Sequence, residues 1–169
     1  KNVITLDMGG TSADVCLIRG SEAGIAFEGE IGGFPVRQPM VDVNAVGAGG
    51  GSIAWFDTDG SLKVGPLSAG AAPGPACYGI GGDQPTVTDA NLILGRLSPK
   101  GLLGGRVHLD VGLARQAFAP IAERLGFAVE RAALGCIDLV VSNMVRAIRG
   151  ISVERGHDPR NFILMPFGG

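Results

Sequence analysis

Acids, glycines and hydroxyl groups occur together near the start of the chain, in the run Asp7-Met8-Gly9-Gly10-Thr11-Ser12-Ala13-Asp14. Gly9 and Gly10 allow positive φ and a close approach of the backbone to a ligand. Consecutive backbone N–H groups in such a turn form an anion-binding concavity, to which Thr11 and Ser12 add hydroxyl groups. Asp7 follows a buried strand, where a carboxylate is costly unless a cation meets it. The run predicts a site for phosphate and a divalent metal; an ordinary tight hairpin with solvated acids is the alternative.

A second glycine-rich loop, Gly47-Ala48-Gly49-Gly50-Gly51-Ser52, lies between two apolar runs. It superficially matches a phosphate loop, but no Gly-Lys-Ser/Thr follows and the next segment is strand-like. It therefore lacks the context of a P-loop or a dinucleotide fingerprint. Two interpretations remain: Gly49 and Gly50 face a ligand, or the glycines form a packed bulge where a neighbouring backbone comes close.

Residues 65–85 are rich in glycine and proline, which predicts an irregular but rigid loop. Cys77 lies in this loop beside Tyr78, which is the only tyrosine of the chain. A nucleophilic or metal-binding Cys77 is one interpretation. A buried, inert thiol is the other, and it is favoured because no histidine is near in sequence.

Composition excludes several classes of function. The net charge is −2 and the cations are scattered, which argues against a nucleic-acid-binding surface. No apolar run approaches the roughly 18 residues that a membrane span requires. The three cysteines are odd in number and far apart, which fits neither a disulfide framework nor a zinc site. We therefore expect a cytoplasmic protein that binds neither nucleic acid nor a membrane.

In the first part of the chain, the sequence pattern predicts that β-strands position these residues. The apolar runs on either side of residues 9–12 predict a hairpin. Residues 24–31 predict a third strand, and residues 40–46 a further half-buried one. A turn at residues 57–60 joins strands 53–56 and 62–64 in a second hairpin.

After residue 85 the pattern becomes helical. Helices are predicted from Thr88 and Asp89 to residue 97, and from Asp110 to Gly126. A third, over residues 130–154, has an apolar stripe that repeats every three or four residues: Leu134, Ile137, Val141, Met144, Ile148 and Ile151. A strand over residues 162–166 then delivers Gly168 and Gly169 at its carboxyl end, where open α/β sheets place ligand-binding loops.

Four further motifs, together with the Asp7–Asp14 run, carry a family resemblance. The run itself resembles the second phosphate motif of the actin, Hsp70 and sugar-kinase superfamily, and Phe167-Gly168-Gly169 resembles the start of its adenosine motif. More narrowly, the chain resembles the hydantoinase A/oxoprolinase family, which includes N-methylhydantoinase A, 5-oxoprolinase and acetone carboxylase relatives. The motifs that carry this second resemblance are Val41-Asp42-Val43-Asn44-Ala45-Val46-Gly47-Ala48-Gly49-Gly50-Gly51-Ser52-Ile53-Ala54, Gly74-Pro75-Ala76-Cys77-Tyr78-Gly79, Pro85-Thr86-Val87-Thr88-Asp89-Ala90-Asn91 and Ser152-Val153-Glu154-Arg155-Gly156-His157-Asp158-Pro159.

The resemblance implies a ribonuclease H-like, actin-like ATPase domain: an α/β fold with a mixed sheet and helices packed on it. We expect residues 1–169 to be part of such a domain within a longer chain, since both ends look cut. Residues 1–68 would be mainly β, residues 69–85 a Gly/Pro-rich loop, and residues 86–169 mainly helical with a final strand.

The implied activity is ATP-dependent hydrolysis of a C–N bond in a cyclic amide such as hydantoin or 5-oxoproline, with ATP and Mg²⁺ as cofactors. The resemblance implies that Asp7 and Asp14 are catalytic and that Asp7 holds the metal. The implied nucleotide-binding residues are Gly9, Gly10, Thr11, Ser12, Gly49, Gly50, Gly168 and Gly169. Implied partners are the small-molecule cyclic amide, a hydantoinase B-type subunit or domain, and a second copy of the chain.

Two departures and two alternatives accompany this prediction. Asn44 stands where many members have histidine, and the first phosphate motif is absent, so this piece should hold half of the nucleotide cleft. The alternatives are a sugar or metabolite kinase of the same superfamily and a non-catalytic nucleotide-binding scaffold.

Overall fold

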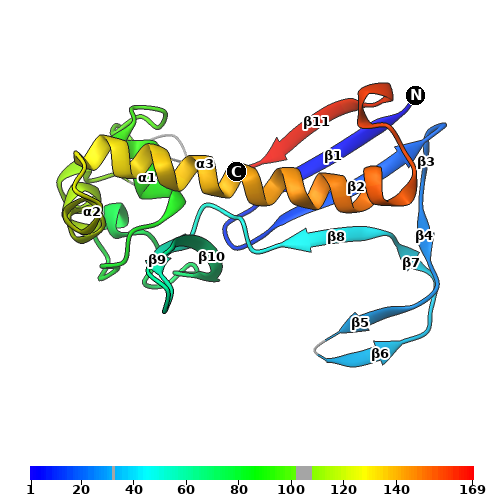
Figure 1. The fold of residues 1–169 in the computed structure, drawn as a ribbon, viewed down its shortest axis with the longest axis horizontal. Helices are drawn as coiled ribbons and strands as arrows, with labels where there is room; N and C mark the ends of the chain where they lie inside the picture. The colour runs from blue at the N-terminus through cyan, green and yellow to red at the C-terminus, as the bar shows by residue number, and fades with distance from the viewer. Residues whose placement is uncertain (32, 102–107) are drawn as a thin grey trace.

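The computed structural model describes residues 1–31, 33–101 and 108–169. Its principal sheet confirms the predicted α/β class (Figure 1). Four strands follow the order β11-β1-β2-β3, and a fifth, β8, pairs with β2. Their bounds are β1 Val3–Met8, β2 Ala13–Arg19, β3 Glu22–Ala23, β8 Val43–Val46 and β11 Ile163–Gly168.

The register of this sheet brings the first and last strands of the chain side by side. The hairpin of β1 and β2 is antiparallel, as predicted, and places Asp7 directly opposite Asp14. Strand β11 runs parallel to β1, with Met8 opposite Gly168. The predicted pairing of the first and last strands is therefore confirmed, and Asp7 and Gly168 lie at the same end of the sheet.

Helix α3 (Val129–Ile151) crosses one face of the sheet and continues into a helical cluster (Figure 1). Over the sheet, Ile4 and Val15 of the hairpin pack against Ala147 and Ile151 of α3. The predicted helix is confirmed, but Val141 of the predicted stripe is 48% exposed. The buried face combines Ile137, Met144 and Ile151 of the stripe with small residues such as Ala133 and Cys136, which let the neighbouring elements pack closely.

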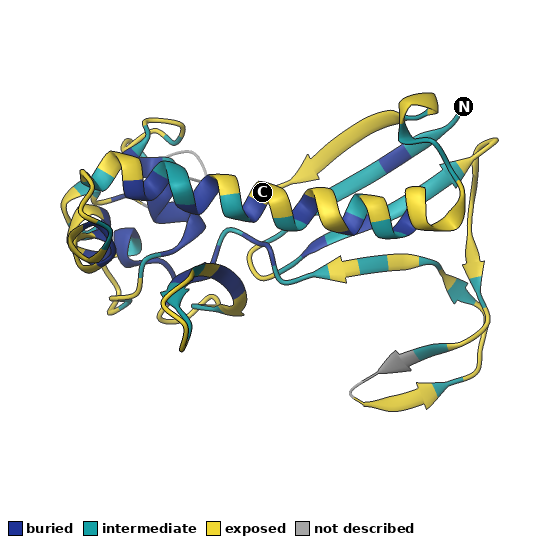
Figure 2. Cartoon of the chain, in the orientation of Figure 1, coloured by how far each residue is buried: buried dark blue, intermediate teal, exposed yellow. Residues whose placement is uncertain are grey.

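The helical cluster contains η1, α1, α2 and the second hairpin, and it holds most of the fully buried residues (Figure 2). The predicted helix from Asp110 to Gly126 is confirmed, since Asp110 caps α2 at its start and Gly126 at its end. The predicted hairpin around residues 57–60 is also confirmed. Besides α3, the elements of the helical cluster are β9 Ser52–Phe56, β10 Leu62–Ser68, η1 Ala76–Tyr78, α1 Val87–Ile93 and α2 Val111–Leu125.

The single strand predicted over residues 24–31 is wrong. The chain instead leaves the sheet after β3 and forms an arm of two small two-stranded sheets, β4–β7 and β5–β6 (Figure 1). The side chain of Asp42 packs beside Gly24, and Met40 of β7 beside Gly29, so these glycines interrupt the strand where the arm folds back. The elements of the arm are β4 Ile25–Ala26, β5 Gly29–Ile31, β6 Phe34–Val36 and β7 Met40–Val41.

Two short helices, η3 (Val153–Arg155) and η4 (Pro159–Asn161), join α3 to β11. No helix in the described part of the chain is long and apolar enough to cross a membrane.

Candidate functional site

The turn that joins β1 to β2 presents unpaired backbone donors. The Gly9 N–H donates to the Ser12 carbonyl at 2.9 Å and closes the turn. The next three N–H groups, of Gly10, Thr11 and Ser12, donate to no acceptor within the described ranges. Three successive free N–H groups in a tight turn form a concavity suited to an anion such as phosphate.

The glycine-rich loop of residues 47–51 packs directly on this turn. The N–H groups of Gly50 and Gly51 donate to the carbonyls of Gly9 and Gly10 at 3.0 and 2.6 Å. A Cβ on Gly49 would lie 2.6 Å from backbone atoms of Gly10 and Thr11. Gly49 thus permits the close packing of two backbones, and the loop holds the turn in place.

A cavity of about 560 Å³ opens beside the turn and the loop. We call it the turn cavity. Of the ten predicted site residues, it brings together Gly9, Gly10, Thr11, Gly50 and Gly169. The remaining residues that line it are Met8, Gly51, Gly70, Ala71, Pro75, Tyr78, Thr88, Asn91 and Leu97.

The far wall of the turn cavity is held by Asp89, which is fully buried. Its carboxylate accepts hydrogen bonds from the N–H groups of Ala76 and Cys77 at 3.3 and 2.8 Å, and from the Thr86 N–H and hydroxyl at 2.9 and 2.7 Å. This network ties η1 to the start of α1 and so fixes Tyr78 and Asn91. From the sequence, Asp89 is predicted only as part of a helix cap; the spacing Thr86-x-x-Asp89 of a capping box could have revealed the network.

Asp7 and Asp14 lie on the other face of the sheet from α3. Leu6, Ala13 and Val15 alternate with them and pack into the core. The two carboxylates share one face at directly opposite positions, where like charges are unfavourable without a cation. The Ser12 hydroxyl donates to Asp14 at 3.1 Å.

This acid pair fits Mg²⁺ in one specific way. Mg²⁺ commonly takes one or two carboxylates together with substrate phosphates and water. No group of three or more His, Cys, Asp or Glu side chains gathers as a metal site among the described residues. The pair therefore suits a metal that arrives with phosphate, and Gly168 keeps the approach open, since a Cβ there would lie 2.6 Å from the Asp7 carboxylate.

Cys77 is buried, and it does not line the turn cavity. Burial, and then the charge of Asp89, raises the pKa of its thiol far above the usual range. A thiol that stays protonated is a poor nucleophile and a poor metal ligand, which favours the inert interpretation. Burial likewise raises the pKa of Cys136 to about 12.

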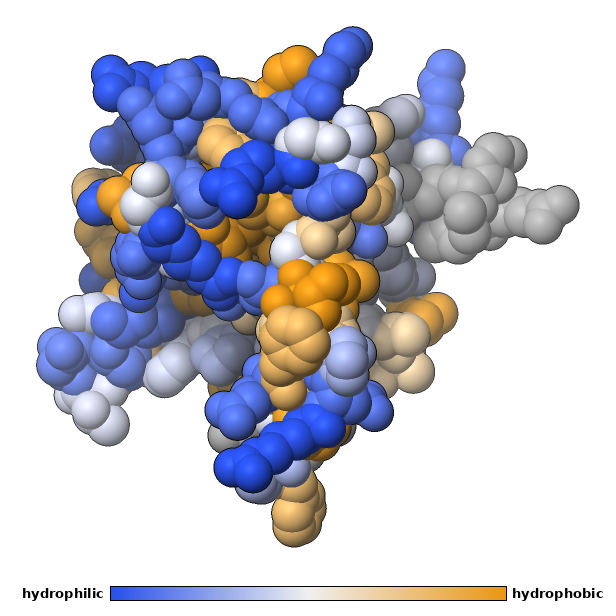
Figure 3. Space-filling model, turned by 90° about the vertical axis from the view of Figure 1, so that its right-hand side faces the viewer, coloured by the Kyte–Doolittle hydropathy of each residue, from blue (hydrophilic) through white to orange (hydrophobic). Residues whose placement is uncertain are grey.

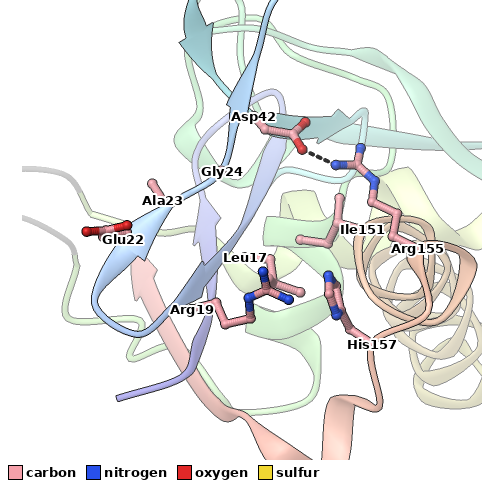
Figure 4. Close-up of a pocket in the computed structure, with 9 residues that line it drawn as sticks. All are labelled: Leu17, Arg19, Glu22, Ala23, Gly24, Asp42, Ile151, Arg155 and His157. Carbon is pink, nitrogen blue, oxygen red and sulfur yellow. Dashed lines mark hydrogen bonds and ion pairs between the residues drawn. The ribbon is translucent and has the colours of Figure 1, made fainter.

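A second pocket, of about 230 Å³, lies at the opposite end of the hairpin, where the arm leaves the sheet (Figure 4). Arg155 forms an ion pair with Asp42 across it, joining η3, which follows α3, to the segment between β7 and β8. Arg19 and His157 project into the same space. The other lining residues are Leu17, Glu22, Ala23, Gly24 and Ile151.

Comparison with known proteins places this geometry in a family. The model of the Hydantoinase/oxoprolinase family matches residues 1–169, the whole of the chain. Caprolactamase subunit alpha from Pseudomonas jessenii is 53% identical over 169 residues, which cover 99% of this chain and 24% of the relative.

Two solved structures share the fold. The crystal structure of ATP-dependent caprolactamase from Pseudomonas jessenii matches with a TM-score of 0.91 and 52% identity, over 100% of this chain and 25% of that one. The nucleotide-free structure of acetone carboxylase, from work on ATP-dependent acetone carboxylation, matches with a TM-score of 0.90 and 35% identity, over 99% and 24% of the two chains. The chain thus spans about a quarter of the length of these relatives.

Proposed function

The chain belongs to the hydantoinase/oxoprolinase family, and we propose that it supplies the phosphate-binding half of the nucleotide cleft in an ATP-dependent enzyme that hydrolyses cyclic amides. The observation that carries this proposal is the 9–12 turn, with three successive free N–H groups beside an acid pair. ATP-dependent relatives with the same fold support the use of ATP.

In this proposal the turn binds phosphate oxygens through the N–H groups of Gly10, Thr11 and Ser12, and through the Thr11 hydroxyl. Asp7 and Asp14 hold Mg²⁺ together with the phosphates. The metal, when bound, neutralises charge that develops on the transferred phosphoryl group. The 47–51 loop, through Gly49 and Gly50, keeps the turn in its binding shape.

Gly168 and Gly169 take the adenosine side of the nucleotide in this proposal. The Gly169 N–H donates to the Met8 carbonyl at 3.1 Å, which places both glycines next to the turn. The absence of a side chain leaves space for the nucleotide to approach the backbone.

The proposed reaction activates an amide bond that resists water. The amide oxygen attacks the γ-phosphorus, the bond to the β–γ bridging oxygen breaks, and ADP leaves with that electron pair. The amide N–H proton passes to solvent, which leaves a phosphorylated imidate. Water adds to its carbon, the C–N bond breaks with protonation of the nitrogen, and a second water releases phosphate from the acyl phosphate. One ATP and two waters are consumed for each ring that opens.

We further propose that residues 1–169 form part of a longer actin-like ATPase domain, with a β part at 1–68, a Gly/Pro-rich loop at 69–85 and a helical part at 86–169. A B-type subunit or domain would complete the enzyme, because a 53% identical relative is named as an alpha subunit. The three cysteines are free thiols, in keeping with the proposed cytoplasmic location.

The test is a substrate screen on the full-length protein with its partner subunit. Hydantoin, 5-oxoproline, ε-caprolactam and acetone with bicarbonate are each incubated with ATP and Mg²⁺, while ADP and organic product are quantified. We expect one ADP for each ring opened with a cyclic amide. Phosphorylated sugar as the product, or ATP hydrolysis at the same rate without any acceptor, would contradict the proposal.

A further inference from the structure

The turn cavity has two chemically different walls. One wall is the backbone of the turn and of the 47–51 loop, and the other comes from η1, α1 and the residues that follow it. The second wall contains Pro75, Tyr78, Asn91 and Leu97, none of which the phosphate-binding role uses. Pro75, Tyr78 and Asn91 belong to family motifs whose residues the nucleotide site does not use.

The lining of the turn cavity carries no charged side chain in the part of the chain that the structure describes. An acceptor with its own carboxylate would lose water there without gaining a cation, which is unfavourable. An uncharged acceptor loses much less. The wall therefore favours a neutral molecule with an apolar body, which can pack on Pro75, Tyr78 and Leu97.

Asn91 is the polar residue of this wall whose side chain makes no hydrogen bond to a described residue. Its backbone carbonyl accepts from the Arg96 N–H at 2.9 Å, but its carboxamide makes no hydrogen bond to any described residue. A carboxamide offers two N–H donors and one carbonyl acceptor. A small cyclic amide holds its N–H and C=O on one edge in the cis arrangement, so it can pair with Asn91 through two hydrogen bonds.

The wall is rigid before a ligand arrives. Asp89 fixes η1 to the start of α1 through its four hydrogen bonds, so Tyr78 and Asn91 keep their relative positions. Thr88 donates from both its N–H and its hydroxyl to the Gly50 carbonyl, at 2.8 and 2.9 Å, which ties α1 to the loop that holds the turn. Burial raises the pKa of the Tyr78 phenol, so that it remains a neutral donor. Pre-organised groups of this kind lose little entropy on binding.

We infer that Tyr78, Asn91 and Leu97 form the acceptor subsite, and that its ligand is a small, uncharged cyclic amide paired through its amide edge with Asn91. The carbonyl oxygen keeps one lone pair free and faces the 9–12 turn across the cavity, where the γ-phosphoryl group is proposed to lie. This inference rests on the proposed function, which it deepens by selecting neutral lactams over carboxylate-bearing ones such as 5-oxoproline.

The experiment compares variants of the full-length protein, assembled with its partner subunit, using ε-caprolactam as the neutral probe and 5-oxoproline as the charged one. The variants are Asn91→Ala and Asn91→Asp, with Asn161→Ala as a matched control on an exposed residue of η4. Each is measured for KM of the amide, and for the dissociation constant of Mg²⁺ with a non-hydrolysable ATP analogue by calorimetry.

We expect both Asn91 variants to raise the KM for ε-caprolactam by about 10- to 100-fold, as loss of one or two hydrogen bonds predicts. Nucleotide affinity should stay at the wild-type value, and Asn161→Ala should change neither quantity. If Asn91→Ala fails to fold, the nearly isosteric Asn91→Asp gives the same readout.

The outcomes distinguish a failure of the proposed subsite from a failure of the proposed function. Wild-type KM in an Asn91 variant that binds nucleotide normally would overturn the subsite and leave the proposed function standing. A higher kcat/KM for 5-oxoproline than for ε-caprolactam would overturn the choice of a neutral acceptor. Failure of the wild-type enzyme to bind nucleotide at all would instead overturn the proposed function.

Discussion

The two ends of the β1–β2 hairpin differ in how they present polar groups. At the turn end, the cavity is lined by backbone and uncharged side chains, and the one nearby buried carboxylate, Asp89, is fully hydrogen-bonded. At the arm end, the pocket is lined by Arg19, Glu22, Asp42 and Arg155, all at least partly exposed. Figure 3 looks onto this end of the molecule and shows hydrophilic residues spread over it, with hydrophobic residues between them.

This difference indicates which motif residues do chemistry. Motifs that carry the family resemblance reach both ends of the hairpin, and at the arm end two of them meet in the ion pair of Asp42 with Arg155. Exposed ion pairs are screened by water and contribute little, whereas pre-organised backbone donors aimed at a bound charge act strongly on it. We therefore propose phosphate chemistry for the turn end and a structural role, bracing the root of the arm, for the ion pair.

The largest expected effect comes from Asp7→Ala at the turn end. Removing the carboxylate that we propose holds the metal should lower ATP turnover of the full-length protein by about 10²–10³, the usual cost of losing one electrostatic contact to the transition state. Because Asp7 lies on the sheet face away from α3, the melting temperature should change little. Turnover near the wild-type rate would remove Asp7 from the site.

The second prediction concerns the packing of the loop on the turn. Gly49→Ala places a Cβ against the backbone of Gly10 and Thr11, and it should cost about 1–3 kcal/mol of unfolding free energy as an overpacked core site does. Gly135→Ala is the matched control, since a Cβ at this position of α3 meets nothing within 4 Å. Denaturant unfolding checks both. Equal stabilities for the two variants would mean that the loop does not hold the turn.

A third prediction concerns the hydrogen bonds of buried Asp89, which hold η1 to the start of α1 behind Tyr78 and Asn91. Asp89→Asn puts an NH₂ group where the carboxylate accepts from N–H and hydroxyl donors, and leaving such a donor unsatisfied costs about 1–3 kcal/mol. Asp83→Asn, at an exposed position of the same segment, should be silent. Thermal unfolding distinguishes the two, and a wild-type melting temperature for Asp89→Asn would argue against the network.

The smallest effect is expected at the arm end. A double-mutant cycle of Asp42→Ala with Arg155→Ala should give a coupling energy below about 1 kcal/mol, the usual range for exposed ion pairs. ATP turnover should be unchanged in all three variants. A loss of turnover comparable to that of Asp7→Ala would contradict the division of roles between the two ends.

Local patterns in the sequence predicted the elements that depend on near neighbours. The apolar runs of the hairpin and the caps at Asp110 and Gly126 predicted their elements because alternation and capping act within a few residues. The arm was missed because glycines interrupt its strands and because β4 pairs with β7 across the intervening β5–β6 hairpin. The stripe of α3 was only partly predicted, since Val141 is large and apolar but exposed, while small buried residues such as Ala133 carry a weak signal.

In the candidate site, the 9–12 turn could be predicted from the sequence, but the far wall of the turn cavity could not. The turn residues are contiguous, so their chemistry could be inferred from type and spacing. The contact of Gly49 with Gly10 joins segments about 40 residues apart, and the cavity brings Tyr78 and Asn91 to a turn more than 60 residues before them in the chain. Such contacts depend on how the elements pack, and local propensity does not encode them.

The most direct test of the central claim is to locate bound nucleotide by hydrogen exchange. The full-length protein is exchanged with and without Mg²⁺ and a non-hydrolysable ATP analogue, and peptides covering residues 8–13 and 19–24 are compared by mass spectrometry. We predict slowed exchange of the Gly10, Thr11 and Ser12 amides, which lack protein acceptors in the described structure, and no change at residues 19–24. Slowed exchange at residues 19–24 with an unchanged turn would contradict the account.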